Sequence, residues 1–224
     1  MKVNLFVMAL CVALSGLAQA QDDQGNSQDD QGGSQHPFRF QLNSTTFANN
    51  DAQLPLIMIA TFNANGPGTN SCTSNGEAGG NQSPELQWTR APGGTRSFVV
   101  IMFDVTASFT HWGMYNIEPR RTMLPLNAGV AGSTFGDQIA NDYGVGDQSY
   151  DGPCPPSASV NPPAHDYVFT IYALDITLPV LPTFDGAPSS GALYHALIDA
   201  ARGDHILASA STHGFYSALI PPGP

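Results

Sequence analysis

Three ionisable side chains lie at the ends of apolar segments of this chain. Asp104 follows one apolar run, His111 opens the next, and His165 stands just before a third. A carboxylate at the end of a buried strand is costly unless it is paired or hydrogen-bonded. His111 would supply such a partner if residues 105–110 form the loop between two strands. The spacing therefore predicts an Asp104–His111 pair near the mouth of the fold.

A rigid glycine-proline pair adds to these side chains. Gly152 and Pro153 precede His165 by about a dozen residues, and glycine allows backbone N–H groups to approach a ligand closely. Imidazoles that are protonated or hydrogen-bonding, together with exposed N–H groups, recognise a phosphate-sized anion. These residues predict a small anion site.

The same side chains leave other functions open. One carboxylate and two imidazoles can hold a metal or serve acid–base hydrolysis. No serine or cysteine, however, lies in a nucleophile motif such as Gly-x-Ser-x-Gly. A lone histidine beside a tryptophan, as His111 is, is often structural. We expect no catalytic activity, no cofactor and no bound metal.

Further motifs follow one another in a fixed order across residues 38–217. Among them are Ser83-Pro84-Glu85-Leu86-Gln87-Trp88, Ala91-Pro92-Gly93-Gly94, Asn141-Asp142-Tyr143-Gly144 and Gly203-Asp204-His205-Ile206. With the aspartate and histidine segments, this order resembles the phosphatidylethanolamine-binding protein family, in particular its bacterial, Raf-kinase-inhibitor-like branch. The resemblance implies a large antiparallel β-sandwich with a few peripheral helices.

In that family an aspartate, two histidines, a Gly-Pro loop and a tyrosine form a small anion pocket. The matching positions in this chain are Asp104, His111, Gly152, Pro153, His165 and Tyr167, with Tyr216 at the border. Two positions depart from the family pattern, because Thr106 replaces a second aspartate and Asp166 replaces an arginine. These departures imply weaker anion binding than the family norm.

The resemblance implies a non-enzymatic binding protein for a small anion, either phosphate or a phospholipid head group. Family members also inhibit kinases or proteases, so a secreted or periplasmic inhibitor, or a binder of another protein target, is the first alternative. A metal-assisted hydrolase that uses Asp104, His111 and His165 is the second.

The first twenty residues predict a cleaved export signal. Lys2 gives a positive start, residues 3–14 are apolar, and the small-x-small site ends at Ala20. The apolar stretch is shorter than the roughly 18 residues that a membrane-spanning helix needs. We therefore do not expect this chain to be an integral membrane protein. Cys11 lies inside the apolar core, a poor position for a lipid-modified cysteine. The mature protein is expected outside the cytoplasm, secreted or periplasmic.

A polar, acidic stretch follows the predicted signal. Residues 21–37 contain two near-identical Asp-rich repeats, and residues 21–35 have no apolar side chain. This composition predicts a disordered tail. Residues 38–220 then suit one domain. Without its signal, the chain has six arginines against eighteen acidic residues, a formal charge of −12. This charge repels phosphate backbones and excludes nucleic acid as an expected partner.

Two cysteines, Cys72 and Cys154, remain after the signal is removed. An even pair in an oxidising compartment predicts a disulfide, although two buried free thiols are the alternative. The family resemblance places both cysteines on the pocket side.

The remaining pattern predicts strands joined by fixed turns. Apolar runs rich in β-branched and aromatic residues cover 97–103, 111–117, 167–174 and 56–60, and the first is expected to be a central strand buried on both faces. One helix is predicted after a cap at Ser189 or Ser190, ending at Arg202 and Gly203. Its expected buried face consists of Leu193, Leu197, Ile198 and Ala201.

Overall fold

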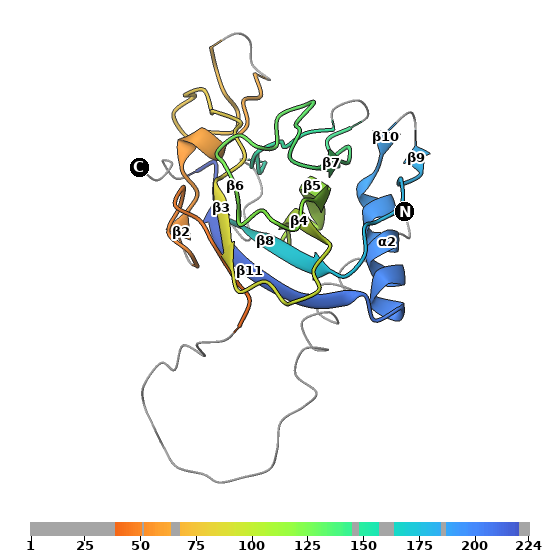
Figure 1. The fold of residues 1–224 in the computed structure, drawn as a ribbon. Helices are drawn as coiled ribbons and strands as arrows, with labels where there is room; N and C mark the ends of the chain where they lie inside the picture. Colours follow the sequence, from red (N-terminus) through yellow and green to blue (C-terminus); the bar gives the residue numbers. More distant parts are fainter. Residues whose placement is uncertain are drawn as a thin grey trace, which may run out of the picture.

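The computed structural model describes residues 39–50, 52–63, 68–144, 148–156, 164–184 and 187–219. The predicted signal 1–20 and tail 21–37 lie outside these ranges, as do residues 38 and 220, the expected limits of the domain. The described chain is mainly β with one α-helix, which confirms the predicted fold class (Figure 1).

The largest sheet has the strand order β2-β11-β8-β4-β5-β7. Its strands are β2 (Ala52–Gln53), β11 (Ile206–Tyr216), β8 (His165–Leu174), β4 (Ser97–Asp104), β5 (Phe109–Ile117) and β7 (Asp137–Gln138). Neighbouring strands are antiparallel, except that β2 pairs with β11 in parallel. A smaller antiparallel sheet contains β1 (Gln41–Asn43), β3 (Leu86–Thr89) and β6 (Met123–Leu124), while β9 (Thr183–Phe184) pairs with β10 (Ala187–Pro188).

Strand β4 is buried along its whole length, as its continuous apolar run predicts. Its even-numbered side chains, from Phe98 to Met102, join a core that includes Leu42 of β1 and Trp88 of β3. Its odd-numbered side chains, from Val99 to Phe103, join a second core with the helix. The main sheet therefore lies between the smaller sheet and helix α2 (Ser190–Arg202) (Figure 1).

Helix α2 begins and ends as the sequence predicts. The Ser189 hydroxyl accepts a hydrogen bond from the Ala192 N–H, and Gly203 caps the other end. The predicted buried face is partly wrong, because Tyr194 and Ala200 are buried beside Leu193 and Leu197 whereas Ile198 and Ala201 are half-buried. The helix is rotated toward Tyr194, whose ring packs edge-on against Phe103. Within the described ranges, no helix combines the length and apolarity that crossing a membrane requires.

The predicted strand at 56–60 is wrong. A short 3-10 helix, η1 (Leu56–Met58), follows Pro55, and the Met58 N–H donates back to the Pro55 carbonyl over 3.0 Å. The carbonyls of Leu56 and Ile57 also accept from the N–H groups of Gly80 and Gln82, respectively. This close approach explains the glycines of the 79–80 pair. A Cβ on Gly79 would collide with the backbone of Ile59 and Ala60, and a Cβ on Gly80 with the backbone of Ile57.

Cys72 and Cys154 form a disulfide, which confirms the predicted pairing. Around it, the Tyr216 hydroxyl donates to the Cys72 carbonyl over 2.6 Å, and the Ala60 N–H donates to the Pro153 carbonyl over 3.2 Å. The bridge joins the loop around residue 72 to the Gly-Pro loop, although the two cysteines are 82 residues apart in sequence.

We expect the Cys72→Ser, Cys154→Ser double variant to unfold more easily than the wild type, by about 2–4 kcal/mol, because the crosslink restricts the unfolded chain. Urea unfolding with and without a reducing agent measures this difference. The reducing agent should lower the midpoint of the wild type and leave that of the double variant unchanged. Equal midpoints for the oxidised wild type and the double variant would contradict a stabilising role.

Candidate functional site

The ends of three adjacent strands place the predicted site residues together. Asp104 is the last residue of β4, and it pairs across the sheet with Tyr167 of β8. The register between β4 and β5 shifts between Met102 and Phe103, so that Met102 lies opposite Trp112 and Phe103 opposite Thr110. His111 is the extra residue of this bulge. The bulge lets Trp112 stay in the core while His111 contacts Tyr167.

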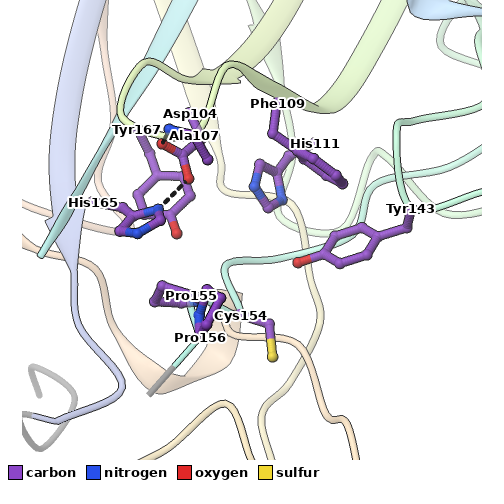
Figure 2. A pocket seen from close by; sticks show the side chains of 10 residues that line it. All are labelled: Asp104, Ala107, Phe109, His111, Tyr143, Cys154, Pro155, Pro156, His165 and Tyr167. Carbon is purple, nitrogen blue, oxygen red and sulfur yellow. Dashed lines mark hydrogen bonds and ion pairs between the residues drawn. The ribbon is translucent and has the colours of Figure 1, made fainter. Parts of the chain in front are cut away.

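These strand ends border a cavity of about 260 Å³. Its walls consist of Asp104, Ala107, Phe109, His111, Tyr143, Cys154, Pro155, Pro156, His165 and Tyr167. Figure 2 shows Asp104, His165 and Tyr167 on one side, Phe109, His111 and Tyr143 on the other, and the Cys154–Pro156 segment between them. A water molecule takes about 30 Å³ in the liquid, so the cavity holds a group several times larger.

Asp104 is 2% exposed and accepts three hydrogen bonds. Its Oδ1 accepts from the N–H groups of Thr106 and Ala107, each over 2.9 Å, and its Oδ2 lies 2.6 Å from Nδ1 of His165. The prediction that Asp104 pairs with His111 is therefore wrong. Because Asp104 lies opposite Tyr167, the diagonal neighbour on the same face is His165, two residues earlier in β8.

His111 hydrogen-bonds to backbone instead. Its Nδ1 lies 2.8 Å from the carbonyl oxygen of Asp151, and its backbone carbonyl accepts from the Asp151 N–H over 3.2 Å. A carbonyl only accepts, so Nδ1 carries the proton. Burial lowers the pKa of His111 below its ordinary 6.5, and the bond to Asp151 and the nearby carboxylates of Asp104 and Asp142 offset only part of this effect. His111 is therefore a neutral imidazole at neutral pH.

Tyr167 brings a hydroxyl to the cavity without a partner among the described residues. The side chain is fully buried, and its oxygen has no hydrogen-bond partner there. Burial, and then the charge of Asp104, raises the pKa of Tyr167 well above 10. The hydroxyl keeps its proton, so it can donate to a bound group.

The charged groups around the cavity are mostly acidic. Asp104 lines it, and the carboxylates of Asp142 and Asp151 act on His111 from nearby. In the described part of the chain, no arginine or lysine lines the cavity. No three His, Cys, Asp or Glu side chains of the described residues are grouped to hold a metal ion. Among the described residues that line the cavity, His111 and His165 are the side chains that can carry a positive charge.

Phe109 and Tyr143 form an aromatic wall that the sequence analysis missed. Their rings lie 4.7 Å apart edge to face, and both contact the His111 ring, at 4.9 and 5.4 Å. The Tyr143 hydroxyl donates to the Gly152 carbonyl over 3.2 Å, which holds this wall against the Gly-Pro loop. The position of Phe109 two residues before His111 was the available signal, since alternate residues of a strand share a face. For Tyr143, only its place in the Asn141–Gly144 motif hinted at a role.

Three predicted pocket residues do not line the cavity. The Gly152 N–H donates to the Asn81 side chain over 2.8 Å, and a Cβ on Gly152 would collide with the Met58 carbonyl, so this glycine serves loop packing. Pro153 uses its carbonyl to accept from Ala60. Tyr216 is fully buried, and its hydroxyl donates to the Cys72 carbonyl. The cavity wall comes instead from the next residues, Cys154 to Pro156.

The two departures from the family pattern pair with neighbours outside the cavity. The Thr106 hydroxyl accepts from the Asp166 N–H over 3.0 Å, and the Asp166 carboxylate lies 3.0 Å from Nδ1 of His213. Neither residue lines the cavity. The carboxylate of Asp166 thus has a histidine partner of its own, which reduces its expected effect on an anion in the site.

Burial of a neutral His111 predicts a loss of stability in acid. The pKa of His111 is lower in the folded protein than the 6.5 of the unfolded chain. The contribution of the neutral imidazole to the free energy of unfolding is therefore complete above pH 6.5, and it falls as the pH drops below that value. We expect His111→Gln to lose less unfolding free energy than the wild type between about pH 7 and about pH 5. Urea unfolding at several pH values tests this.

His195→Gln is the matched control, because His195 is exposed on α2. This variant should keep the wild-type acid dependence. If His111→Gln and the wild type lose equal free energy over that pH range, His111 does not carry a lowered pKa.

Comparisons with known proteins agree with this architecture. The model of the phosphatidylethanolamine-binding protein family matches residues 32–217. A UPF0098 protein of Methanothermobacter thermautotrophicus is 34% identical over 158 residues, covering 69% of this chain and 93% of the relative. The UPF0098 protein YbcL of Escherichia coli is 35% identical over 131 residues, covering 54% of this chain and 66% of YbcL.

Solved structures show the same fold. The crystal structure of Escherichia coli YbcL, described as a new member of the mammalian PEBP family, aligns with a TM-score of 0.59 at 28% identity, over 80% of this chain and 98% of YbcL. A phosphatidylethanolamine-binding protein homologue of Chlamydia trachomatis, at 24% identity, gives a TM-score of 0.57 over 80% of this chain and 98% of its own. This chain belongs to the phosphatidylethanolamine-binding protein family, in its bacterial, YbhB/YbcL-type branch.

Proposed function

We propose that this protein is an exported, non-enzymatic binding protein whose cavity takes a small phosphoryl group. One observation carries the proposal: the imidazoles of His111 and His165 border one cavity together with the Tyr167 hydroxyl, which has no partner among the described residues (Figure 2). Imidazole and hydroxyl groups are hydrogen-bonding partners that suit an oxyanion. Family membership supports the same ligand class.

His165 supplies the positive charge in this proposal. Its Nδ1 donates to the Asp104 carboxylate at 2.6 Å, which leaves Nε2 for a ligand. A protonated His165 forms an ion pair with Asp104 and donates a second hydrogen bond from Nε2. Hydrogen bonds with an ionised partner are about twice as strong as neutral ones. The buried Asp104 thereby fixes the orientation of the His165 ring through Nδ1.

The surroundings argue for binding over catalysis. Four of the ten residues that line the cavity are the aromatic wall of Phe109 and Tyr143 and the prolines of the loop, Pro155 and Pro156. Among the described residues, its walls contain no serine or threonine hydroxyl, and Cys154 is in a disulfide and cannot act as a thiolate nucleophile.

The disulfide supports the export part of the proposal, because such bridges persist mainly outside the cytoplasm. We expect the mature chain to begin at Gln21, after cleavage that follows Ala20. N-terminal analysis of protein recovered from the cell envelope or the medium tests this expectation, with detection of an N-terminal pyroglutamate included. A mature protein that retains Met1 would argue against cleavage and export by this route.

Calorimetric titration with inorganic phosphate tests the ligand. We expect saturable binding that His165→Ala weakens by about tenfold or more, since one charge-assisted hydrogen bond is lost. His195→Ala, which removes an exposed imidazole from α2, should bind as the wild type does. Equal affinity of the wild type and His165→Ala would rule out the proposed site.

A further inference from the structure

The positions of hydrogen-bond donors and acceptors in the cavity wall limit which phosphoryl compounds fit. Nδ1 of His111 must donate to the Asp151 carbonyl, because a carbonyl has no proton to give. In the neutral imidazole, Nε2 then carries only a lone pair. No described residue hydrogen-bonds to this nitrogen in the structure, and the residue as a whole is 3% exposed. A ligand that fills the cavity must donate a hydrogen bond to Nε2 or leave a buried acceptor unpaired.

The opposite side of the cavity requires acceptors. The Tyr167 hydroxyl keeps its proton and has no partner among the described residues. A protonated His165 donates from Nε2, because its Nδ1 already bonds to Asp104. An occupant that satisfies all three groups therefore accepts on the His165 and Tyr167 side and donates on the His111 side.

The ionisable groups near His111 come from every segment packed around it. They are Asp104 of β4, Asp142 and Tyr143 after β7, Asp151 of the Gly-Pro loop, and His165 and Tyr167 of β8. The three carboxylates make this region electronegative, and no arginine or lysine of the described chain lines the cavity to balance them. A doubly charged anion is more strongly disfavoured here than a singly charged anion that carries a hydroxyl.

We propose that His111 makes the cavity selective for phosphoryl groups in their monoprotonated form, such as the monoanion of a phosphate monoester. In this state the P–OH donates to His111 Nε2, while the remaining oxygens accept from His165 and Tyr167. A phosphodiester and a sulfate have no such proton near neutral pH. This inference rests on the proposed phosphoryl-binding function and identifies His111 as the residue that determines specificity.

The selectivity can be measured on the wild-type protein with ligands of different acidity. A monoester loses its second proton near pH ~6, and phenyl phosphate loses it at lower pH than inorganic phosphate does. Calorimetry between about pH 5 and about pH 8 should show affinity falling as each ligand loses that proton, with a lower midpoint for phenyl phosphate. Any titration of the protein's own groups is common to both ligands, so the difference between the midpoints reports the ligand's own proton.

Dimethyl phosphate and sulfate should bind about five- to a hundredfold more weakly than inorganic phosphate at acidic pH, since each leaves His111 Nε2 unpaired. Glycerophosphoethanolamine separates a lipid head group from a monoester, because its phosphate is a diester, and it should bind more weakly than phosphoethanolamine. In His111→Gln, whose side-chain amide can donate as well as accept, the preference for inorganic phosphate over sulfate should shrink.

If the affinity falls with the same pH midpoint for all ligands, or if a diester binds as tightly as its monoester, the selectivity is overturned while phosphoryl binding remains. If none of the ligands binds at any pH, the proposed function itself fails, and the selectivity with it. The wild-type ligand series decides the question even if His111→Gln does not fold.

Discussion

The arrangement of the site depends on the carboxylate of Asp104. It ends the central strand β4, where a bare charge would be strongly unfavourable, and it accepts from two backbone N–H groups and one imidazole. The N–H bonds hold the turn at 105–108, in which Ser108 has a positive φ of 55°. The same carboxylate orients His165 toward the cavity through its Nδ1.

The opposite wall depends on different interactions, which begin in loops. The disulfide attaches the Gly-Pro loop to the loop around residue 72, and the Ala60–Pro153 hydrogen bond attaches it to the chain just after η1. Asn81 bonds to both Gly152 and Asp151. Asp151 in turn sets the tautomer of His111 through its carbonyl. A loop residue outside the strands thereby decides whether Nε2 of His111 carries a lone pair or a proton. The loop thus fixes the chemistry of the cavity as well as its shape.

Sequence patterns predicted the parts of the fold that depend on local or periodic signals. The apolar run of β4, the serine cap of α2 and the cysteine pair all appear in the structure as expected. The errors have tertiary causes. Close packing against the 79–82 segment, together with Pro55, turns the expected strand at 56–60 into η1. The bulge in β5 separates His111 from Asp104, and no one-dimensional spacing encodes which of two histidines pairs with a carboxylate across a sheet.

The family resemblance identified the cavity more reliably than it identified each contact. It brought together Asp104, His111, His165 and Tyr167, which all line the cavity, but it could not show that Gly152 is used for packing or that Tyr143 is part of the wall. These differences change the expected recognition. A glycine N–H directed at a ligand would favour any oxyanion, whereas in this structure that N–H is bound to Asn81. Under the proposed function, recognition then depends on the Tyr167 phenol and on two imidazoles, which Asp104 and Asp151 orient by hydrogen bonds. Because these groups differ in whether they donate or accept, such a site would distinguish ligands by the positions of their protons as well as by their charge.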